Sequence, residues 1–479
     1  MENQPHKIAL WWIRRDLRLT DNQALSAALE YASVVIPVFI LDAALFTSST
    51  VSAKRRDFMV EGLRRLDETL RVRASYLVVR KGNPVQEICK LVAETKASMV
   101  FAEEDYSPYA RQRDTKVAEM VPFRLMPGLT VHHPRAVVKN DGRPYTVFTP
   151  FSKAWKSLPP PFKMLPAPQR IATPMGIPSD ELPAENTDIH VHYPAGEAEA
   201  NQRLANFIRG PHPRVHDYHL RRDRPDLNAT SSLSPYLRFG MLSPRHAVIA
   251  AIKIMQLAPS AASRQGVESW LNELIWREFF QAILYHFPQV HEGSFRKDLQ
   301  NIRWENDPAM FQAWCAGGTG YPIVDAAMRQ LVQTGWMHNR ARMIVASFLT
   351  KDLLIDWQWG EKWFMQHLVD GDVAANNGGW QWAAGTGTDA APYFRVFNPI
   401  LQGQKFDPHG TYIRTWLPEL REVPEKFIHT PWEMPLAEQH RHGVVIGTHY
   451  PAPIIDHTWA RERTLEAYAL AQKEATENK

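Results

Sequence analysis

The first 130 or so residues alternate short apolar runs with amphipathic segments, and this alternation restricts the fold more than any other feature of the chain. The apolar runs are rich in Val, Ile and aromatic residues, as buried parallel strands are. They lie at Ile8–Ile13, Val34–Leu41, Tyr76–Val79 and Met99–Phe101. Segments with helical spacing separate them, at Asn22–Tyr31, Ala53–Leu70 and Pro84–Glu94. Such an alternation predicts a doubly wound α/β domain around a parallel, Rossmann- or flavodoxin-like sheet.

The remainder of the chain has a different pattern. From about Leu158 to Pro194 the sequence is dense in proline and has no sustained period, which is typical of a linker. From about Asn201 onward long helical patterns dominate, without convincing β alternation. A chain of 479 residues also exceeds a single hydrophobic core. We therefore expect an α/β domain over residues 1–132, a linker over 133–200 and an all-helical domain over 201–479.

Simple features disfavour several classes of protein. Cys89 and Cys315 are the only cysteines and lie far apart, so neither a disulfide framework nor a zinc site is indicated, and a reducing cytoplasm fits. No apolar stretch approaches the roughly 20 residues of a membrane helix, and Met1–Lys7 lacks the apolar core of a secretory signal. The first strand leads into Trp12–Arg18 instead of a Gly-x-Gly-x-x-Gly turn, which disfavours an ordinary dinucleotide site.

The distribution of tryptophan directs attention to the second half of the chain. Of 16 Trp, 13 follow residue 240. The net charge of +4 permits a nucleic-acid partner without requiring one. One predicted helix has four side chains at i, i+3, i+4 and i+7, and thus on one face: Glu273, Trp276, Arg277 and Phe280. A surface ion pair beside a core aromatic stripe explains this spacing equally well.

Three further segments combine polar and aromatic side chains. A second helical face carries Trp336, Asn339, Arg340 and Met343. This face would suit a flat, weakly polar heterocycle, although ordinary helix packing is favoured by the segment alone. The segment Asp370–Trp382 joins glycine-rich turns to two indoles, a combination that plain turns seldom have. The run Thr230–Pro235 would bind a phosphate at a helix start or merely cap the helix, and the sequence favours the cap.

In this order and spacing, the four segments resemble the photolyase/cryptochrome family. They are most similar to its microbial class I DNA photolyases, which act on cyclobutane pyrimidine dimers. The resemblance extends from Trp12–Arg18 to Tyr412–Pro418 and is most specific over Asn376–Arg395. It implies an N-terminal α/β domain and a C-terminal all-helical domain that binds FAD, in agreement with the patterns above.

The resemblance also implies which residues contact FAD. They are Tyr218, Thr230, Ser231, Ser232, Leu233, Ser234, Trp270, Arg277, Asn339, Arg342, Asp370, Asp372 and Asn376. Asn376 matches the residue that faces flavin N5, where plant cryptochromes carry Asp. Asparagine at this position favours a flavin that cycles through its fully reduced anion.

The implied reaction is light-driven repair of cyclobutane pyrimidine dimers in DNA. No protein side chain is reducing enough to inject an electron, so excited reduced FAD donates it to a flipped-out dimer, the ring opens and the electron returns. Glu273 matches the group that hydrogen-bonds the dimer bases, and Trp276 and Trp382 match the walls of the dimer pocket. Asn339 and Met343 match residues between flavin and lesion.

Two more sets of residues follow from the resemblance. An indole relay that carries electrons from the surface to oxidised flavin matches Trp380, Trp357 and Trp304. Contacts to the DNA backbone match Arg222, Arg340 and Arg395, beside the pocket residues Glu273, Trp276 and Trp382. We therefore expect DNA with pyrimidine dimers as the partner, no metal and no membrane, and a cytoplasmic monomer that associates with the nucleoid when bound to DNA.

Several relatives offer alternatives. The (6-4) photolyases use a His pair where this chain has Asn339 and Met343, and DASH cryptochromes usually replace a pocket Trp. A blue-light-sensing cryptochrome that signals through protein partners is the main alternative, but the chain stops about 60 residues after Leu417-Pro418 without a long disordered tail. An electron-transfer flavoprotein that uses NAD(P)H would need a nucleotide site, which the sequence lacks.

A second, light-harvesting chromophore is the least determined feature. Folate-binding relatives place a carboxylate after the fourth strand, where this chain has Tyr109-Ala110-Arg111, and this departure weakens a folate antenna. A deazaflavin or flavin antenna in the α/β domain stays open, as does an empty site.

Overall fold

The computed structural model describes residues 7–46, 51–184 and 193–477. The predictions for the first six residues and for the part of the linker at 185–192 concern positions outside these ranges. Internal packing divides the chain into two compact units, each described by itself. Unit 1 comprises Met1–His219, Thr230–Pro288 and Val369–Ala374, and unit 2 comprises Leu220–Ala229, Gln289–Leu368 and Ala375–Lys479.

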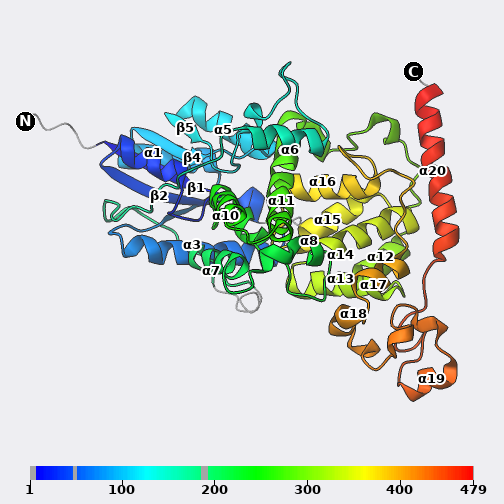
Figure 1. The fold of residues 1–479 in the computed structure, drawn as a ribbon. Coiled ribbons are helices and arrows are strands. Elements are labelled where there is room, and N and C mark those ends of the chain that lie inside the picture. Colours follow the sequence, from blue (N-terminus) through cyan, green and yellow to red (C-terminus); the bar gives the residue numbers. More distant parts are fainter. Residues whose placement is uncertain (1–6, 47–50, 185–192, 478–479) are drawn as a thin grey trace, which may run out of the picture. The chain divides into compact units, whose positions relative to one another are not determined.

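Unit 1 begins with a five-stranded parallel sheet in the order β3-β2-β1-β4-β5 (Figure 1). The strands are β1 (Ile8–Ile13), β2 (Val34–Leu41), β3 (Val78–Lys81), β4 (Met99–Glu103) and β5 (Phe123–Met126). The central strand β1 is paired on both sides, with Leu10 opposite Ile36 of β2 and Val100 of β4. Because the strand order reverses at β1, the sheet is doubly wound, and the predicted α/β fold is confirmed.

The four predicted apolar runs all contain strands, and the differences have physical causes. β3 begins at Val78 instead of Tyr76, because the backbone N–H of Leu77 donates to the Asp67 side chain (2.8 Å). β5 was not predicted. It is an edge strand with Arg124 and Leu125 exposed, so it lacks the continuous apolar run of a buried strand.

The helices around the sheet are α1 (Gln23–Tyr31), α2 (Ala43–Phe46), α3 (Ala53–Arg71), α4 (Pro84–Thr95) and α5 (Pro108–Met120). α1, α3 and α4 match the predicted segments. Each begins at a side chain that accepts a backbone N–H of the first turn, from Asn22, Ser52 and Asn83. Buried apolar residues, Leu10, Val38 and Val100 among them, form the core of this layer.

Unit 1 continues with helices that lie farther along the chain. They are α6 (Phe148–Ser157), α7 (Glu197–Ile208), α9 (Ser234–Arg238), α10 (Pro244–Gln256) and α11 (Ala261–His286), with α8 (Tyr218–Arg221) at the boundary to unit 2. α6 falls within residues 133–200, because Phe151 and Trp155 give this stretch an apolar face that it buries. α11 packs against α10 and α6 and carries several of the predicted site residues.

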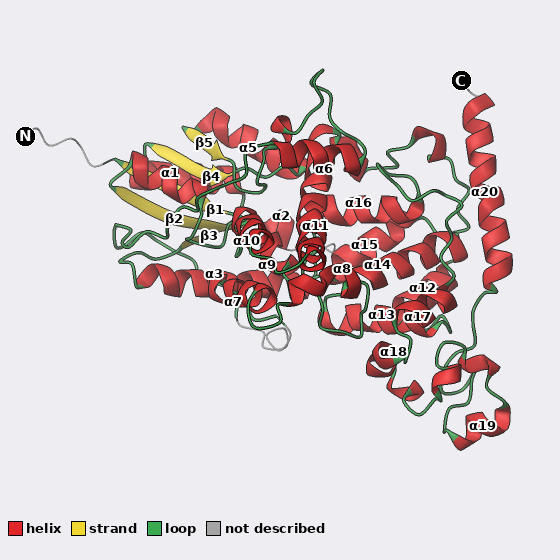
Figure 2. Cartoon of the chain, in the orientation of Figure 1, coloured by secondary structure: helices red, strands yellow, loops and turns green. Residues whose placement is uncertain are grey.

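Unit 2 is helical throughout the range that the structure describes. Its principal helices are α12 (Pro308–Ala316), α13 (Pro322–Thr334), α14 (Asn339–Ser347), α15 (Trp357–His367), α16 (Val373–Ala384), α17 (Pro399–Phe406), α18 (Thr411–Trp416), α19 (Leu436–Arg441) and α20 (His457–Glu477). A π-helix, η6 (Phe348–Asp352), follows α14. Buried residues including Trp314, Leu331 and Trp380 form the core. Figure 2 shows the strands confined to the N-terminal sheet, as predicted.

None of the helices within the described ranges is both long enough and apolar enough to cross a lipid bilayer.

Candidate functional site

In unit 1 the loop Asp370–Asp372 is held by groups from three elements. Gln281 of α11 donates a 3.0 Å hydrogen bond from Nε2 to Oδ1 of Asp372. Arg238 of α9 donates from Nε to the carbonyl of the middle residue at 2.7 Å. Arg15, which follows β1, forms an ion pair with Asp372. Both carboxylates of the loop are buried. The loop is thus fixed in one position, as a preorganised binding site requires.

Arg238 has an unused hydrogen-bond donor beside this loop. Its Nη1 is buried and has no hydrogen-bond partner among the residues that the structure describes. Burial, together with the nearby charge of Arg15, lowers the pKa of this guanidinium to about 9. Because a buried donor without a partner costs free energy, the position suits a ligand that supplies an acceptor.

The segment Thr230–Ser234 leads into α9 without capping it. Leu233 occupies the N-cap position, and no side chain accepts from the first turn of α9. The alternative that these hydroxyls simply cap the helix is therefore wrong. Ser232 has a left-handed backbone, with φ of 50°, which a non-glycine residue adopts only at a cost. Strained backbone of this kind is concentrated at binding sites.

An aromatic row in unit 1 joins two predicted cofactor residues. The ring of Phe207 on α7 lies 5.3 Å from that of Trp270 and 5.9 Å from that of Tyr218, edge-on to both. Both Trp270 and Tyr218 are buried. These contacts fix the planes of two rings that are more than 50 residues apart in the chain.

Arg277 on α11 holds backbone carbonyls. It donates from Nη1 to the carbonyl of Leu129 at 2.9 Å and from Nη2 to that of Leu237 at 3.5 Å. The next residue, Glu278, accepts from the Trp155 indole at 2.6 Å, and burial raises the pKa of this carboxyl. Arg277 and Glu278 together attach residues that precede α6, α6 itself and α9 to α11. Glu278 was not among the predicted site residues.

Trp276 belongs to a cluster of aromatic rings on α11. Its indole is stacked face to face on Phe148 at the start of α6, with 3.7 Å between centroids and an angle of 4° between planes. Phe279 and Phe280 each lie 5.5 Å from it. Trp276 and Phe148 are both half-exposed. The indole therefore has a fixed orientation and remains accessible.

In unit 2, Glu361 of α15 orients the two asparagines at the start of α16. Its carbonyl accepts from Nδ2 of Asn376 at 3.0 Å, and its Oε1 accepts from Nδ2 of Asn377 at 3.1 Å. Gln381 donates to Oδ1 of Asn377 at 3.0 Å. Burial raises the pKa of Glu361 to about 7. Asn376 is buried, and its amide plane is set by this contact.

The first turns of α14 present the predicted polar face. Nδ2 of Asn339 lies 3.9 Å from Sδ of Met343, one helical turn later. Asn339 is exposed and Met343 half-exposed, so this face is only partly packed within unit 2. Arg342 donates from Nε to the Met337 carbonyl at 2.8 Å. His338 caps the helix through Nδ1, and burial lowers its pKa to about 4, so the ring is neutral near pH 7.

The three predicted DNA-binding arginines are all in unit 2. Arg340 pairs with Asp223 at 3.0 Å and lies 4.3 Å from the ring centre of Phe406. Arg222 is half-exposed and Arg395 is exposed. Two of the three guanidinium groups are thus accessible to solvent at least in part, and the third is held by a carboxylate.

The three tryptophans predicted to form a relay are anchored separately in unit 2. Trp380 lies 5.0 Å from Phe364 and 6.1 Å from Trp314. Trp304 packs edge-on against Tyr468 at 6.0 Å, and Trp357 is buried. Within the described part of the chain, none of the three relay rings stacks directly on another. Trp382 is half-buried against the same core.

Comparison with known proteins shows the family to which the chain belongs. Residues 9–169 match the family described as DNA photolyase, and residues 270–470 match the FAD binding domain of DNA photolyase. The chain is 40% identical to the deoxyribodipyrimidine photo-lyase of Synechococcus sp., over 97% of this chain and 98% of that protein. It belongs to the DNA photolyase family.

Solved structures of photolyases and cryptochromes share the fold. A class III photolyase from Agrobacterium tumefaciens matches with a TM-score of 0.91 and 38% identity, over 98% of this chain and 99% of that one. A Synechocystis sp. cryptochrome matches with a TM-score of 0.87 and 30% identity, over 98% and 100%. The family resemblance and the two-domain fold with a helical FAD-binding domain are confirmed, and the structural likeness includes class III.

Among photolyase residues that the sequence did not single out, four support predicted ones. Phe148 stacks on Trp276, Glu361 orients Asn376, and Gln281 and Arg238 hold the loop Asp370–Asp372. Gln281 offered a usable signal, because a polar side chain on a helix rich in apolar residues needs a buried partner. Phe148 offered none, because its stretch of chain has no clear period.

Proposed function

We propose that this photolyase repairs cyclobutane pyrimidine dimers in DNA in a light-dependent reaction with FAD. One observation carries the proposal: the chain matches a deoxyribodipyrimidine photo-lyase at 40% identity over essentially the whole of both proteins. The division of residues into an α/β domain, 1–132, a linker, 133–200, and a catalytic domain, 201–479, is part of this proposal.

The residues in unit 1 fit a dinucleotide such as FAD. Asp370 and Asp372 offer buried carboxylates for hydroxyl groups, and Nη1 of Arg238 lacks a partner beside them. Thr230 to Ser234 supply hydroxyls that are not used as a helix cap. Tyr218 and Trp270 offer apolar contact. Arg277, Asn339, Arg342 and Asn376 complete the set by resemblance to the family.

Reduced FAD, when bound, supplies the excited-state electron that opens the cyclobutane ring. The chain binds and orients. Glu273 hydrogen-bonds the bases of the dimer, which requires a neutral or proton-sharing carboxyl group. Trp276 and Trp382 form apolar walls, and Asn339 and Met343 line the space between them and the cofactor. The amide plane of Asn376 is set by Glu361, and by resemblance to the family this side chain would face N5 of the bound flavin.

The indoles of Trp304, Trp357 and Trp380 relay electrons inward when the flavin is oxidised. Arg222, Arg340 and Arg395 contact DNA phosphates. Because a dimer stacks and pairs poorly, flipping it out costs less than flipping intact bases, and this difference provides selectivity. The protein acts as a monomer in the cytoplasm, associated with the nucleoid when bound to DNA.

The antenna proposal rests on Arg111 of α5. Its Nη1 donates to the Tyr285 carbonyl at 3.0 Å, and its guanidinium lies 4.8 Å from the ring centre of Tyr285. A cation thus occupies the segment in which folate-binding relatives carry a carboxylate. This supports a deazaflavin or flavin antenna, or an empty site, over folate. Denaturing the purified protein and identifying the released chromophores by mass spectrometry tests the assignment.

Illumination of a damaged oligonucleotide tests the repair function. We expect photoreduced protein to restore a cyclobutane dimer to two pyrimidines under near-UV or blue light, and to leave it intact in darkness. Intact dimers after illumination, with the protein bound to the damaged strand, would favour the cryptochrome alternative, which the likeness to the Synechocystis sp. protein makes the second candidate.

A further inference from the structure

The loop after β1 directs two neighbouring arginines to different partners. Arg14 pairs with Asp114 of α5, at 2.6 and 2.5 Å from Nη1 to the two carboxylate oxygens, and so binds within the α/β layer. Arg15 pairs with Asp105 after β4, at 3.3 Å, and with Asp372, which is 357 residues away in the chain. Both arginines are largely buried.

We propose that Arg15 is a positioning residue for the cofactor, which fixes Asp372 and with it the loop Asp370–Asp372 against FAD. The inference rests on the proposed role of this loop in FAD binding and adds a residue of the α/β sheet to that site. All of the contacts that carry it lie within unit 1.

The carboxylate of Asp372 has both oxygens occupied. Oδ1 accepts from Nε2 of Gln281 and from the backbone N–H of Ala374, each at 3.0 Å. Oδ2 receives Arg15, with Nε of Arg238 farther away, at 3.9 Å. The contact of Arg15 with Oδ2 is thus shorter than that of Arg238. Without Arg15, the carboxylate loses a close ion pair that fixes its plane.

Arg15 is itself held rigidly. Its Nε donates to the Arg238 carbonyl at 3.2 Å, and the N–H of Leu17 donates to the Phe239 carbonyl at 3.1 Å. Gly240 has φ of +61°, and a Cβ there would overlap the carbonyl of Arg15, so the two backbones approach as only glycine permits. The turn after α9 is thus in direct contact with the loop after β1.

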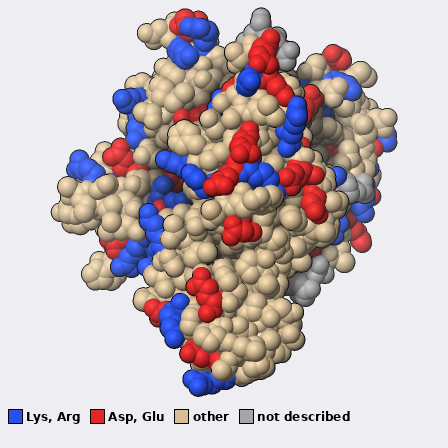
Figure 3. Space-filling view, turned by 90° about the vertical axis from the view of Figure 1, so that its right-hand side faces the viewer, with Lys and Arg blue, Asp and Glu red and all other residues tan. Residues whose placement is uncertain are grey.

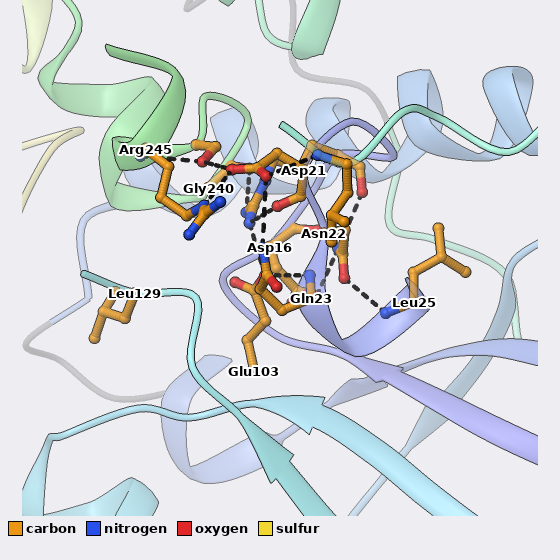
Figure 4. Close-up of polar contacts among 12 residues, drawn as sticks. Asp16, Asp21, Asn22, Gln23, Leu25, Glu103, Leu129, Gly240 and Arg245 are labelled. Carbon is orange, nitrogen blue, oxygen red and sulfur yellow. Dashed lines mark hydrogen bonds and ion pairs between the residues drawn. The ribbon is translucent and has the colours of Figure 1, made fainter. Parts of the chain in front are cut away.

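A polar network around Asp21 and Glu103 strengthens this attachment (Figure 4). Arg18 pairs with Glu103 at 2.6 Å and donates from Nη1 to the Gly240 carbonyl at 3.1 Å. Asp21 accepts from Oγ of Ser243 at 2.5 Å and pairs with Arg245 at 3.2 Å. The segment 14–22 thereby links the sheet to α9 and α10. This link gives a structural role to the Trp12–Arg18 motif, which has no part in the proposed reaction.

The charges around Asp372 make Arg15 difficult to replace. Arg55, Arg238 and Arg277 are further cations near this carboxylate, and burial lowers the pKa of Arg55 to about 10 and that of Arg238 to about 9. Loss of Arg15 would leave two buried carboxylates, Asp105 and Asp372, without their shared partner. Buried charges that lose a partner move or recruit water, and either response displaces the loop.

The test measures the rate constant of flavin release from the holoprotein after dilution, by the rise in flavin fluorescence. We expect Arg15→Gln to release FAD at least about tenfold faster than the unmodified protein. Arg14→Gln is the matched control, because it removes another largely buried ion pair from the same loop. It should lower the thermal midpoint to a similar extent and change the release rate by less than about twofold.

Asp372→Asn and the double variant separate the two premises. If Arg15 acts through Asp372, the double variant releases FAD no faster than Asp372→Asn alone. The proposal is overturned if Arg15→Gln releases flavin as slowly as Arg14→Gln. If Asp372→Asn nevertheless releases FAD fast, the role of the loop Asp370–Asp372 in FAD binding still holds. If Asp372→Asn also releases FAD slowly, that role is contradicted too. If Arg15→Gln does not fold, Arg15→Lys replaces it, because lysine keeps the charge but lacks the forked guanidinium. We expect this variant to release FAD at a rate between those of the unmodified protein and Asp372→Asn, and to show a flavin absorption band with less resolved fine structure.

Discussion

At the scale of single residues, aromatic contacts outside the predicted set determine how the predicted residues are oriented. Trp276 is the clearest case, because one face of its indole is covered by Phe148 in an almost perfectly parallel stack. A base that packs on the opposite face would extend this stack to three rings. Aromatic pairs contribute about 0.5–1.5 kcal/mol beyond the area they bury.

We predict that Phe148→Ala weakens binding of a dimer-containing oligonucleotide by about fivefold, close to 1 kcal/mol, because the indole loses its fixed plane. The yield of repair per bound dimer should not change. Phe162→Ala is the control, since Phe162 is 81% exposed and lies in the same connecting region. Equal dissociation constants for the two variants would contradict the prediction.

The proposed indole relay leads to a second prediction about single residues. Trp357→Phe should slow the photoreduction of oxidised flavin to a small fraction of its normal rate, because phenylalanine is far harder to oxidise than tryptophan. Chemically reduced protein with the same substitution should repair dimers normally. Trp359→Phe, on the same helix α15, controls for packing effects. Loss of repair in the prereduced variant would argue against a relay role.

At the scale of elements, the π-helix η6 contains an unusual buried cation. Lys351 is 1% exposed, donates from Nζ to the Ala384 carbonyl at 3.0 Å and lies 3.6 Å from the ring centre of Tyr468. Burial lowers its pKa to about 7. The unfolded chain keeps the ordinary lysine pKa near 10.5. Between these two values the unfolded state holds one more proton than the folded state, so stability rises with pH.

We therefore predict that Lys351→Met stabilises the protein at pH 6 and that its advantage shrinks by about 2 kcal/mol between pH 6 and pH 9. Thermal midpoints of the variant and the parent, measured at both values of pH, check this. Lys473→Met, at a solvent-exposed site of α20, should show the same difference from the parent at both. A constant gap for Lys351→Met would mean that this amine stays charged.

The elements also show what the sequence could predict. Four buried strands and three helices follow from apolar periodicity, because each has a continuous apolar run or face. The edge strand β5 does not, since half of it faces solvent. The identity of the partners of Asp372 could not be predicted either, because the tertiary fold brings Arg15 and Gln281 to it. The place of Gln281 on an apolar helix indicated only that its side chain needs a buried partner. Family resemblance led to the proposed residues of the site, but not to the ones that orient them.

At the scale of the whole molecule, the net charge is small. The net charge is only +4, and on the face drawn in Figure 3 Lys and Arg are interspersed with Asp and Glu. A chain of this kind should bind DNA through a limited number of phosphate contacts. The slope of log K against log salt then reports the number of those phosphate contacts.

We predict that Arg395→Gln weakens binding to damaged and undamaged DNA alike and lowers the slope of log K against log salt by about 1. The exposed Arg461 of α20 is not among the proposed DNA contacts, and Arg461→Gln should leave the slope unchanged. An unaltered slope for Arg395→Gln would remove this arginine from the phosphate-binding set.

The composition of unit 1 from three separate stretches of chain has a consequence for biosynthesis. Its last stretch is Val369–Ala374, so the ribosome must have translated more than three quarters of the message before Arg15 and Gln281 can meet Asp372. Until Asp372 has been synthesised, Arg15 beside the sheet lacks this carboxylate partner. A fragment that ends at Pro288 would lack Asp372 permanently. Fusing the peptide Val369–Ala374 to this fragment would restore the missing partner.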